Sequence, residues 1–184
     1  MQHGSSARKF FTPKIHDVDE VIKKATVTRQ PQKVFVHVGT NNLMKDDLND
    51  DAIEAMQREL DNMFGVLRRA FPDSTIYVSS ILIRKDVQFK DAIIQLNEFL
   101  EQAVLHSSKF VLVKHSNISE PEKMLRDDRH LSNAGFARFL ANIRWVLFGI
   151  MPRLRRMGTH NTRDDDRYYR PNYRSFRPRF YNRN

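Results

Sequence analysis

Three short apolar runs predict strands. Residues 33–39, 74–82 and 110–113 are rich in β-branched and aromatic side chains and show little alternation between apolar and polar positions. Such runs are typical of strands that are buried on both faces, as in a parallel sheet. The sequence therefore predicts a parallel sheet built from these three segments.

Between the strands, apolar residues recur at helical spacing. This spacing predicts helices over 50–70, 87–106 and 134–148, the last capped by Ser132 or Asn133. In the first helix the apolar positions are Ile53, Met56, Leu60, Met63, Phe64 and Leu67. In the second helix they are expected to turn inward and are Ile93, Ile94, Leu96, Phe99, Leu100 and Ala103. In the third helix they are Phe136, Phe139, Leu140, Ile143, Val146 and Leu147. Alternating strands and helices favour an α/β fold, a three-layer α/β/α sandwich around a flavodoxin-like sheet with right-handed crossovers.

Charge divides the chain into two parts. The 184 residues carry 31 Lys plus Arg against 22 Asp plus Glu, a formal charge of +9. Residues 152–184 hold ten Arg, no Lys and three Asp, so +7 of that charge lies there and +2 on the other 151 residues. The tail also contains no Val, Ile or Ala. We therefore predict a folded domain over 1–151 and a disordered basic tail over 152–184.

Composition excludes several classes of protein. The absence of cysteine rules out disulfide frameworks, thiolate zinc sites and cysteine nucleophiles. No stretch reaches the roughly 18 apolar residues of a membrane span, and the first residues lack the apolar region of a signal peptide. We therefore expect an intracellular protein, either cytoplasmic or nuclear.

Two loops at strand ends carry candidate chemistry. Asn41 follows the first predicted strand directly, where its amide can point N–H donors over the sheet edge. Asp127 and His130 precede the last helix, and their spacing lets the carboxylate hold imidazole Nδ1 while Nε2 faces outward as a base. Reactive groups of α/β sheets collect at such loops. Each pattern also occurs in ordinary turns, because Asn and Gly favour turns and a surface histidine is often only solvated.

The order of these segments resembles the SGNH, or GDSL-type, hydrolase family. VFVHVGTNNL resembles its third block, LRDDRHLSNAGFARFLANI its fifth, and SSILIR the segment between them in eukaryotic and retroelement-associated members. HGSSARKF is similar to the second block, and an amphipathic helix follows it through Ile15, Val18, Val21 and Ile22. The resemblance covers residues 2–149 and implies the SGNH hydrolase fold, with the N-terminal central strand missing.

That resemblance implies a serine esterase site that uses no metal and no cofactor. His130 would be the general base, Asp127 its orienting partner, and Asn41 and the backbone N–H of Gly4 two oxyanion-hole donors. Ester hydrolysis needs both a base and preorganised donors of this kind. Asn42 replaces the Asp common in the family, a change that touches none of these roles.

The nucleophile block of the family has no counterpart in this sequence. Its serine lies in a Gly-Asp-Ser motif on a strand before the second block, and we expect Ser5 and Ser6 instead to cap the following helix. Without that strand the segment 33–39 has an unpaired edge, open to a partner or to self-association. We expect the chain to be part of a longer protein, and a partner strand or rearranged N-terminal residues are the alternative.

Other polar residues near the strand ends have structural explanations. We expect His37 to be a packed core histidine rather than a catalyst. His115 and Ser116 follow the third strand and either line the site or, as we expect, form a turn.

The basic tail predicts binding of single-stranded RNA or DNA. Arginine neutralises phosphates while aromatic rings stack on unpaired bases. The candidate contacts are Arg167, Tyr169, Arg170, Tyr173, Arg174, Phe176, Arg177 and Arg179. The alternative is a solvated end that only keeps the protein soluble.

Two functions are compatible with the sequence. The leading hypothesis is an SGNH-type esterase domain of retroelement-like origin, specific for an acyl or acetyl ester. As the isolated chain it is expected to be inactive, because the nucleophilic serine is absent, and its tail binds nucleic acid. The alternative is a non-catalytic SGNH-like RNA-binding module that retains Asp127 and His130 as relics.

Overall fold

The computed structural model describes residues 7–25, 29–43 and 49–150. All of them belong to the first of the two units into which the chain divides, Met1–Pro152 and Arg153–Asn184. None of the helices in these described ranges combines the length and hydropathy that crossing a bilayer requires.

Within the described residues, a parallel sheet of three strands forms the centre of this unit. The strands are β1 (Lys33–Val36), β2 (Thr75–Ser79) and β3 (Phe110–Val113), in the order β1-β2-β3. Val36 pairs with Val78, and Val78 in turn pairs with Leu112. The parallel sheet confirms the α/β prediction, and each strand lies inside the apolar run that predicted it.

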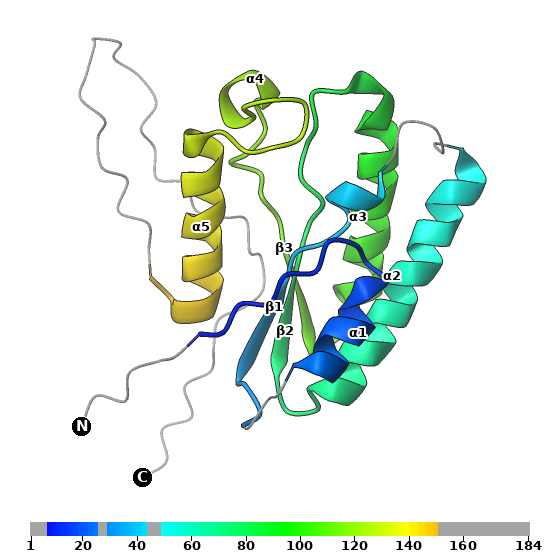
Figure 1. Cartoon of the computed structure of the whole chain (residues 1–184), viewed down its shortest axis with the longest axis vertical. Coiled ribbons are helices and arrows are strands. Elements are labelled where there is room, and N and C mark those ends of the chain that lie inside the picture. Colours follow the sequence, from blue (N-terminus) through cyan, green and yellow to red (C-terminus); the bar gives the residue numbers. More distant parts are fainter. Residues whose placement is uncertain (1–6, 26–28, 44–48, 151–184) are drawn as a thin grey trace. The chain divides into compact units, whose positions relative to one another are not determined.

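Helices cover both faces of the sheet, as the predicted sandwich requires (Figure 1). The helices α1 (Asp17–Lys24), α2 (Asp50–Ala70) and α3 (Lys90–Leu105) lie on one side, and α5 (Asn133–Phe148) lies on the other. The described residues also form three short helical turns: η1 (Thr40–Asn42), η2 (Val87–Phe89) and α4 (Pro121–Met124).

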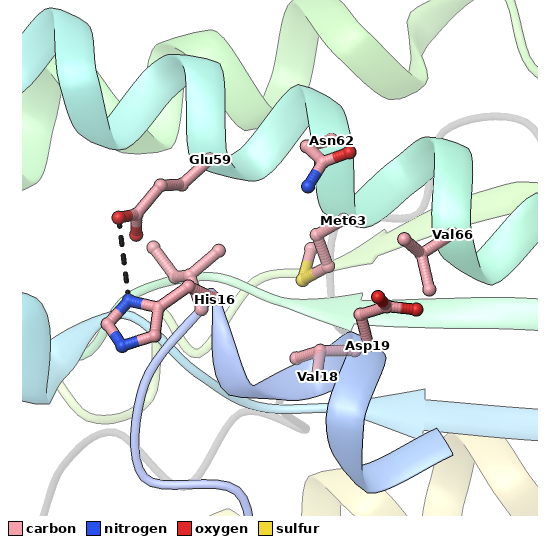
Figure 2. A pocket seen from close by; sticks show the side chains of 8 residues that line it. His16, Val18, Asp19, Glu59, Asn62, Met63 and Val66 are labelled. Atoms are coloured by element: carbon pink, nitrogen blue, oxygen red, sulfur yellow. Dashed lines mark ion pairs between the residues drawn. The ribbon is translucent and has the colours of Figure 1, made fainter. Parts of the chain in front are cut away.

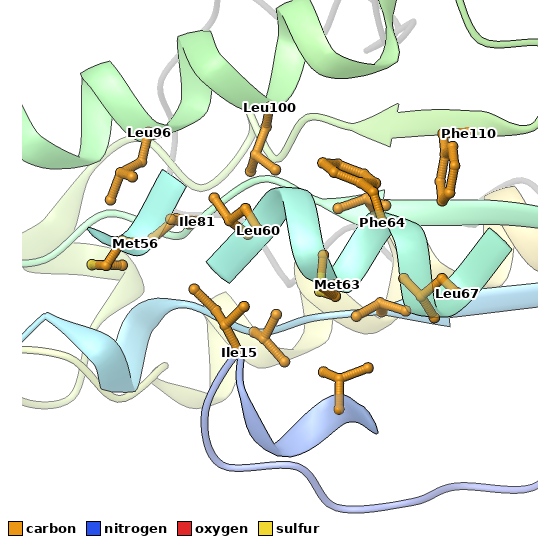
Figure 3. Close-up of a cluster of buried hydrophobic side chains, with 14 of the residues drawn as sticks. Ile15, Met56, Leu60, Met63, Phe64, Leu67, Ile81, Leu96, Leu100 and Phe110 are labelled. Carbon is orange, nitrogen blue, oxygen red and sulfur yellow. The ribbon is translucent and has the colours of Figure 1, made fainter. Parts of the chain in front are cut away.

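The main core lies between the sheet and the helices α1, α2 and α3 (Figure 3). Every apolar residue predicted to line α2 is buried there, because a 3.6-residue period places them on one stripe. In α3 the prediction was wrong at Ile94, which is 45% exposed, and at Ala103, which is also exposed. The sheet has three strands within the described residues, so α3 buries fewer of its apolar residues than their spacing suggested.

The opposite face is covered by α5 with a different kind of contact. Its buried residues are Gly135 and Asn142, while Phe139 packs edge-on against Phe35 of β1 at 6.3 Å between ring centroids. Phe136 and Leu140, which the periodicity grouped into one stripe with Phe139, are exposed. The apolar stripe of α5 is therefore wider than the surface that the described sheet offers it.

Local capping explains where α2 and α5 begin. The Asn49 side chain accepts a hydrogen bond from the Ala52 N–H at 2.8 Å at the start of α2. Ser132 does the same for the Gly135 N–H at 3.2 Å, which confirms Ser132 as the cap of α5. Each side chain satisfies an N–H that the first helical turn leaves unpaired.

The outer edge of β1 carries no strand within the described part of the chain. Unpaired N–H and C=O groups along such an edge are a template for another strand. The sequence-based expectation of an open edge at this strand therefore agrees with the observed sheet order.

Candidate functional site

Asp127 and His130 form a close pair in the loop before α5. His130 Nδ1 lies 2.9 Å from each carboxylate oxygen of Asp127. Asp127 Oδ1 also accepts the backbone N–H groups of His130 at 2.7 Å and Arg129 at 3.1 Å. The imidazole side chain is 57% exposed, so the predicted pair exists and faces solvent.

This pair sits on a small antiparallel hairpin. Leu125 and Leu131 form an antiparallel bridge, and the Arg126 N–H donates to the His130 carbonyl at 2.8 Å. Behind the hairpin, α5 passes so close to α4 that a Cβ on Gly135 would lie 2.1 Å from the Met124 carbonyl oxygen. Only glycine permits this approach, and the hairpin is thereby held against the start of α5.

The electrostatics of the pair fix the proton on His130. Hydrogen bonds from the backbone N–H groups of His130 and then Arg129, followed by the His130 ring, hold the pKa of Asp127 well below its usual range. The ionised carboxylate only accepts hydrogen bonds, so Nδ1 must carry the proton. In the neutral ring Nε2 is then the acceptor, which is the form of a general base.

The loop after β1 places Asn41 and Asn42 differently. Gly39 has φ of +106°, a conformation that favours glycine and turns the chain into η1. Asn41 is exposed, and its Nδ2 donates to the Pro13 carbonyl at 3.1 Å. A side-chain amide has two N–H donors, so a second one is available for an oxyanion.

Asn42 has a structural role. Its Oδ1 accepts the Ile15 N–H at 3.1 Å, and its Nδ2 donates to Glu59 at 3.0 Å. These bonds tie the segment before α1 to α2 and leave Asn42 outside the candidate chemistry, as the sequence indicated.

The loop after β2 joins both candidate loops. Arg84 donates to the Leu43 carbonyl at 3.0 Å, two residues beyond Asn41. The neighbouring Lys85 N–H donates to the Asp128 carbonyl at 2.9 Å, between Asp127 and His130. The structure therefore brings the two loops to the same edge of the sheet, where parallel strands end.

A buried network of hydrogen-bonded side chains beside the sheet was not predicted from the sequence. Ser79 Oγ lies 2.8 Å from His37 Nδ1 and 2.9 Å from His115 Nε2. His115 Nδ1 in turn meets Asn142 Nδ2 at 2.9 Å, and Asn142 pairs with Asn117. Ser79 belongs to β2 and Asn142 to α5, while His37 and His115 lie just beyond the ends of β1 and β3. The available sequence signal was His37 and Ser79, two polar residues inside predicted strands.

The direction of the hydrogen bonds in this network argues against catalysis by Ser79. Asn142 donates to His115 Nδ1, so His115 Nε2 carries the proton and donates to Ser79 rather than activating it. Burial lowers the pKa of His115 to about 3, helped by repulsion from His37, and lowers that of His37 to about 4. Both histidines are therefore neutral structural groups at neutral pH. The expected turn is present as well, since the Ile118 N–H donates to the His115 carbonyl at 2.8 Å, and the His115 side chain adds the contacts of this network.

The cavity in Figure 2 is not lined by Asp127 or His130. It lies between α1 and α2, has a volume of about 30 Å³ and is lined by residues such as His16, Glu59 and Met63. Such a space holds about one water molecule. Across the described ranges, no group of three His, Asp or Glu side chains converges to hold a metal ion.

Several predicted site residues lie outside the described residues. They are Gly4, Ser5 and Ser6 at one end, and Arg167, Tyr169, Arg170, Tyr173, Arg174, Phe176, Arg177 and Arg179 at the other. The remaining candidates, Asn41, Asp127 and His130, carry the site described above.

Comparison with solved structures identifies the fold. An acetyl esterase mutant and a carbohydrate esterase family 3 protein of Talaromyces cellulolyticus each match with a TM-score of 0.56, at 19% and 20% identity, over 74% of this chain and 67% of theirs. A protein described as a platelet activating factor of Streptococcus pneumonia matches with a TM-score of 0.59 at 17% identity, over 73% of this chain and 68% of that one. No family model and no curated protein matches the sequence. Two of these structural neighbours are described as esterases, and the chain shares the α/β fold of all three.

Proposed function

We propose that this domain is the base-bearing and oxyanion-binding part of an SGNH-type serine esterase that cleaves an acyl or acetyl ester. One observation carries the proposal: the Asp127 carboxylate holds His130 Nδ1 at 2.9 Å while the ring stays exposed. The esterase fold of the structural neighbours supports the same reaction class.

The chemistry follows from the orientation of the two residues. His130 Nε2 takes the proton of a serine hydroxyl as its oxygen attacks the ester carbonyl. The second N–H of Asn41, and the backbone N–H of Gly4, donate to the oxyanion that forms. His130 then gives the proton to the departing alcohol, and water repeats the sequence to release the acid.

The serine is assigned to a strand that pairs with the open edge of β1. A strand parallel to β1 at that edge ends at the same side of the sheet as the loops of Asn41 and His130. Its last residue would therefore meet both groups. Ser5 or Ser6 is the competing nucleophile within this sequence.

A fusion experiment tests this assignment. We would join an apolar strand ending in Gly-Asp-Ser to the N-terminus and measure hydrolysis of p-nitrophenyl acetate. The unfused chain is expected to show only background hydrolysis, whereas the fusion should turn over and should lose turnover in His130→Ala. A fused strand ending in Gly-Asp-Ala is the matched control.

The outcome that contradicts the proposal is equally defined. Turnover by the unfused chain that disappears in Ser5→Ala or Ser6→Ala would assign the nucleophile to this segment instead. A folded fusion with no activity dependent on His130 would reject the esterase.

A second function is proposed for the tail, on the basis of its composition. The ten arginines of residues 152–184, together with six aromatic residues from Tyr168 to Tyr181, favour binding to single-stranded RNA or DNA. If the domain lacks ester hydrolysis, the protein would act as an RNA-binding module with an esterase-like fold. Binding of the full chain to a labelled single-stranded RNA, compared with residues 1–151, measures this function.

A further inference from the structure

Arg84 is a buried arginine in the loop after β2. Its side chain is only 5% exposed, and that of its ion-pair partner Asp86, 2.7 Å away, is 12% exposed. Burying a charged pair is costly, and apolar side chains of similar size often stabilise a fold as well or better. A contribution to stability is therefore a weak explanation for a charged residue at this position.

Three anchors hold the guanidinium in place. Nη1 donates to the Leu43 carbonyl, Nη2 pairs with Asp86, and the group lies over the Phe89 ring with 4.1 Å between the guanidinium carbon and the ring centroid. Phe89 is fully buried in the main core. Arg84 therefore links the loop after β1 to a rigid part of the molecule.

The backbone of the next residue completes the connection. The Lys85 N–H donates to the Asp128 carbonyl at 2.9 Å, and Lys85 Nζ lies 3.3 Å from Glu122 of α4. Since the anchored Arg84 side chain fixes the backbone beside it, the direction of the Lys85 N–H is fixed as well. One dipeptide thus contacts both the loop of Asn41 and the loop of His130.

We propose that Arg84 is a positioning residue that sets the spacing between the amide of Asn41 and the imidazole of His130. The inference rests on the proposed function, because the spacing matters only if one reacting group meets both side chains. Misplacement by about 1 Å can lower an enzymatic rate on the order of 100-fold.

Arginine suits this position better than lysine does. A planar guanidinium offers donors in several directions and stacks flat on an aromatic ring. A lysine ammonium can retain the ion pair with Asp86 but cannot reach Leu43 and cover Phe89 with the same geometry. Arg84→Lys should therefore restore only part of the effect lost in Arg84→Met.

NMR on the full chain tests the proposal without requiring activity. In Arg84→Met, the Lys85 amide should exchange with solvent at least about 10-fold faster, and the side-chain signals of Asn41 and His130 should shift. Amides of α2 and α3 should keep their wild-type protection, and Arg84→Lys should lie between the two proteins. If Arg84→Met does not fold, the same comparison is made on Arg84→Lys alone.

Two results would overturn the proposal. One is unchanged Lys85 exchange together with unchanged Asn41 and His130 signals. The other is an equal acceleration of exchange throughout α2 and α3, which would give Arg84 a purely global role. Neither result depends on ester hydrolysis, so the failure of this inference is distinguishable from the failure of the proposed function.

Discussion

Acid should lower the free energy of unfolding by protonating His37 and His115, the two histidines of the buried hydrogen-bond network. His115 is 6% exposed and bonded between Ser79 and Asn142, and His37 completes the chain on the other side of Ser79. None of these hydrogen bonds involves a carboxylate, and Arg138 of α5 donates to the carbonyl of Asn117 at 2.6 Å. The perturbation is the replacement His115→Gln, which retains hydrogen-bonding capacity but cannot titrate.

The magnitude follows from the two folded pKa values of about 3 and about 4, against 6.5 in the unfolded chain. Because both folded values are depressed, the unfolded state binds more protons below pH 6.5. The stability contribution is therefore complete above pH 6.5 and is lost as the pH falls toward 4 and 3. Between pH 8 and pH 5, each of the two histidines should lower the free energy of unfolding by about 2 kcal/mol, and the pair by about 4 kcal/mol.

Urea unfolding at several pH values measures this loss. Trp145, the single tryptophan, lies on α5 and reports its release from the sheet by fluorescence. In His115→Gln the loss of unfolding free energy between pH 8 and pH 5 should fall by about 2 kcal/mol relative to wild type. His106→Gln, at an exposed position, is the matched control and should leave the pH dependence unchanged.

The reasoning would be refuted by His115→Gln showing the wild-type pH dependence. It would then follow that His115 is not buried neutral in the folded protein. An equally large change of the pH dependence in His106→Gln would also show that the loss of stability in acid does not come from the buried network.

Three further predictions concern the site and the tail. Gly135→Ala should destabilise the protein by about 2 kcal/mol or more in urea unfolding, because the new Cβ would collide with the Met124 carbonyl. The control Gly65→Ala in α2, where the nearest atom is 3.4 Å from the new Cβ, should instead stabilise the protein by about 0.5–1 kcal/mol. Equal effects of the two substitutions would contradict the prediction. In the serine-strand fusion, Asp127→Asn should lower kcat on the order of 10³-fold in the p-nitrophenyl acetate assay, and wild-type kcat would contradict the orienting role. Removal of residues 152–184, which carry a net charge of +7, should weaken RNA binding in a fluorescence-anisotropy titration. The slope of the logarithm of the binding constant against the logarithm of salt concentration should become less steep by up to about 5. Unchanged affinity would reject the tail as the binding segment.

Much of the fold was predictable because its signals are local. The helix over 50–70 matches α2 at both ends, since Asn49 caps it and its apolar stripe repeats without interruption. The run 110–113 matches β3 for the same reason, as four apolar residues between polar ones define its ends. Local capping and periodicity need no knowledge of what lies across the sheet.

What the sequence did not predict depends on tertiary partners. Leu140 and Ile94 look like core residues by period but are exposed, because the sheet beside them is only three strands wide in the described part of the chain. Asn142 looks like a surface residue of α5 but is buried, because His115 and Asn117 approach it from distant segments. Only the folded chain shows which side of an amphipathic helix has a neighbour.

The candidate site divides in the same way. Asp127 and His130 are three residues apart, so their contact was predictable from a single turn. The link from the loop of Asn41 to the loop of His130 runs through Arg84, bonded to Leu43, and Lys85, bonded to Asp128, and no local sequence pattern indicates it.

The central claim is that Asp127 holds His130 with Nε2 free to act as a base, and long-range ¹H–¹⁵N NMR of the histidine rings tests it most directly. The full chain is measured at pH 8, with Asp127→Asn as the comparison. The account predicts that neutral His130 carries its proton on Nδ1 and that this preference weakens in Asp127→Asn. A neutral His130 protonated on Nε2 in the wild-type chain would contradict the account.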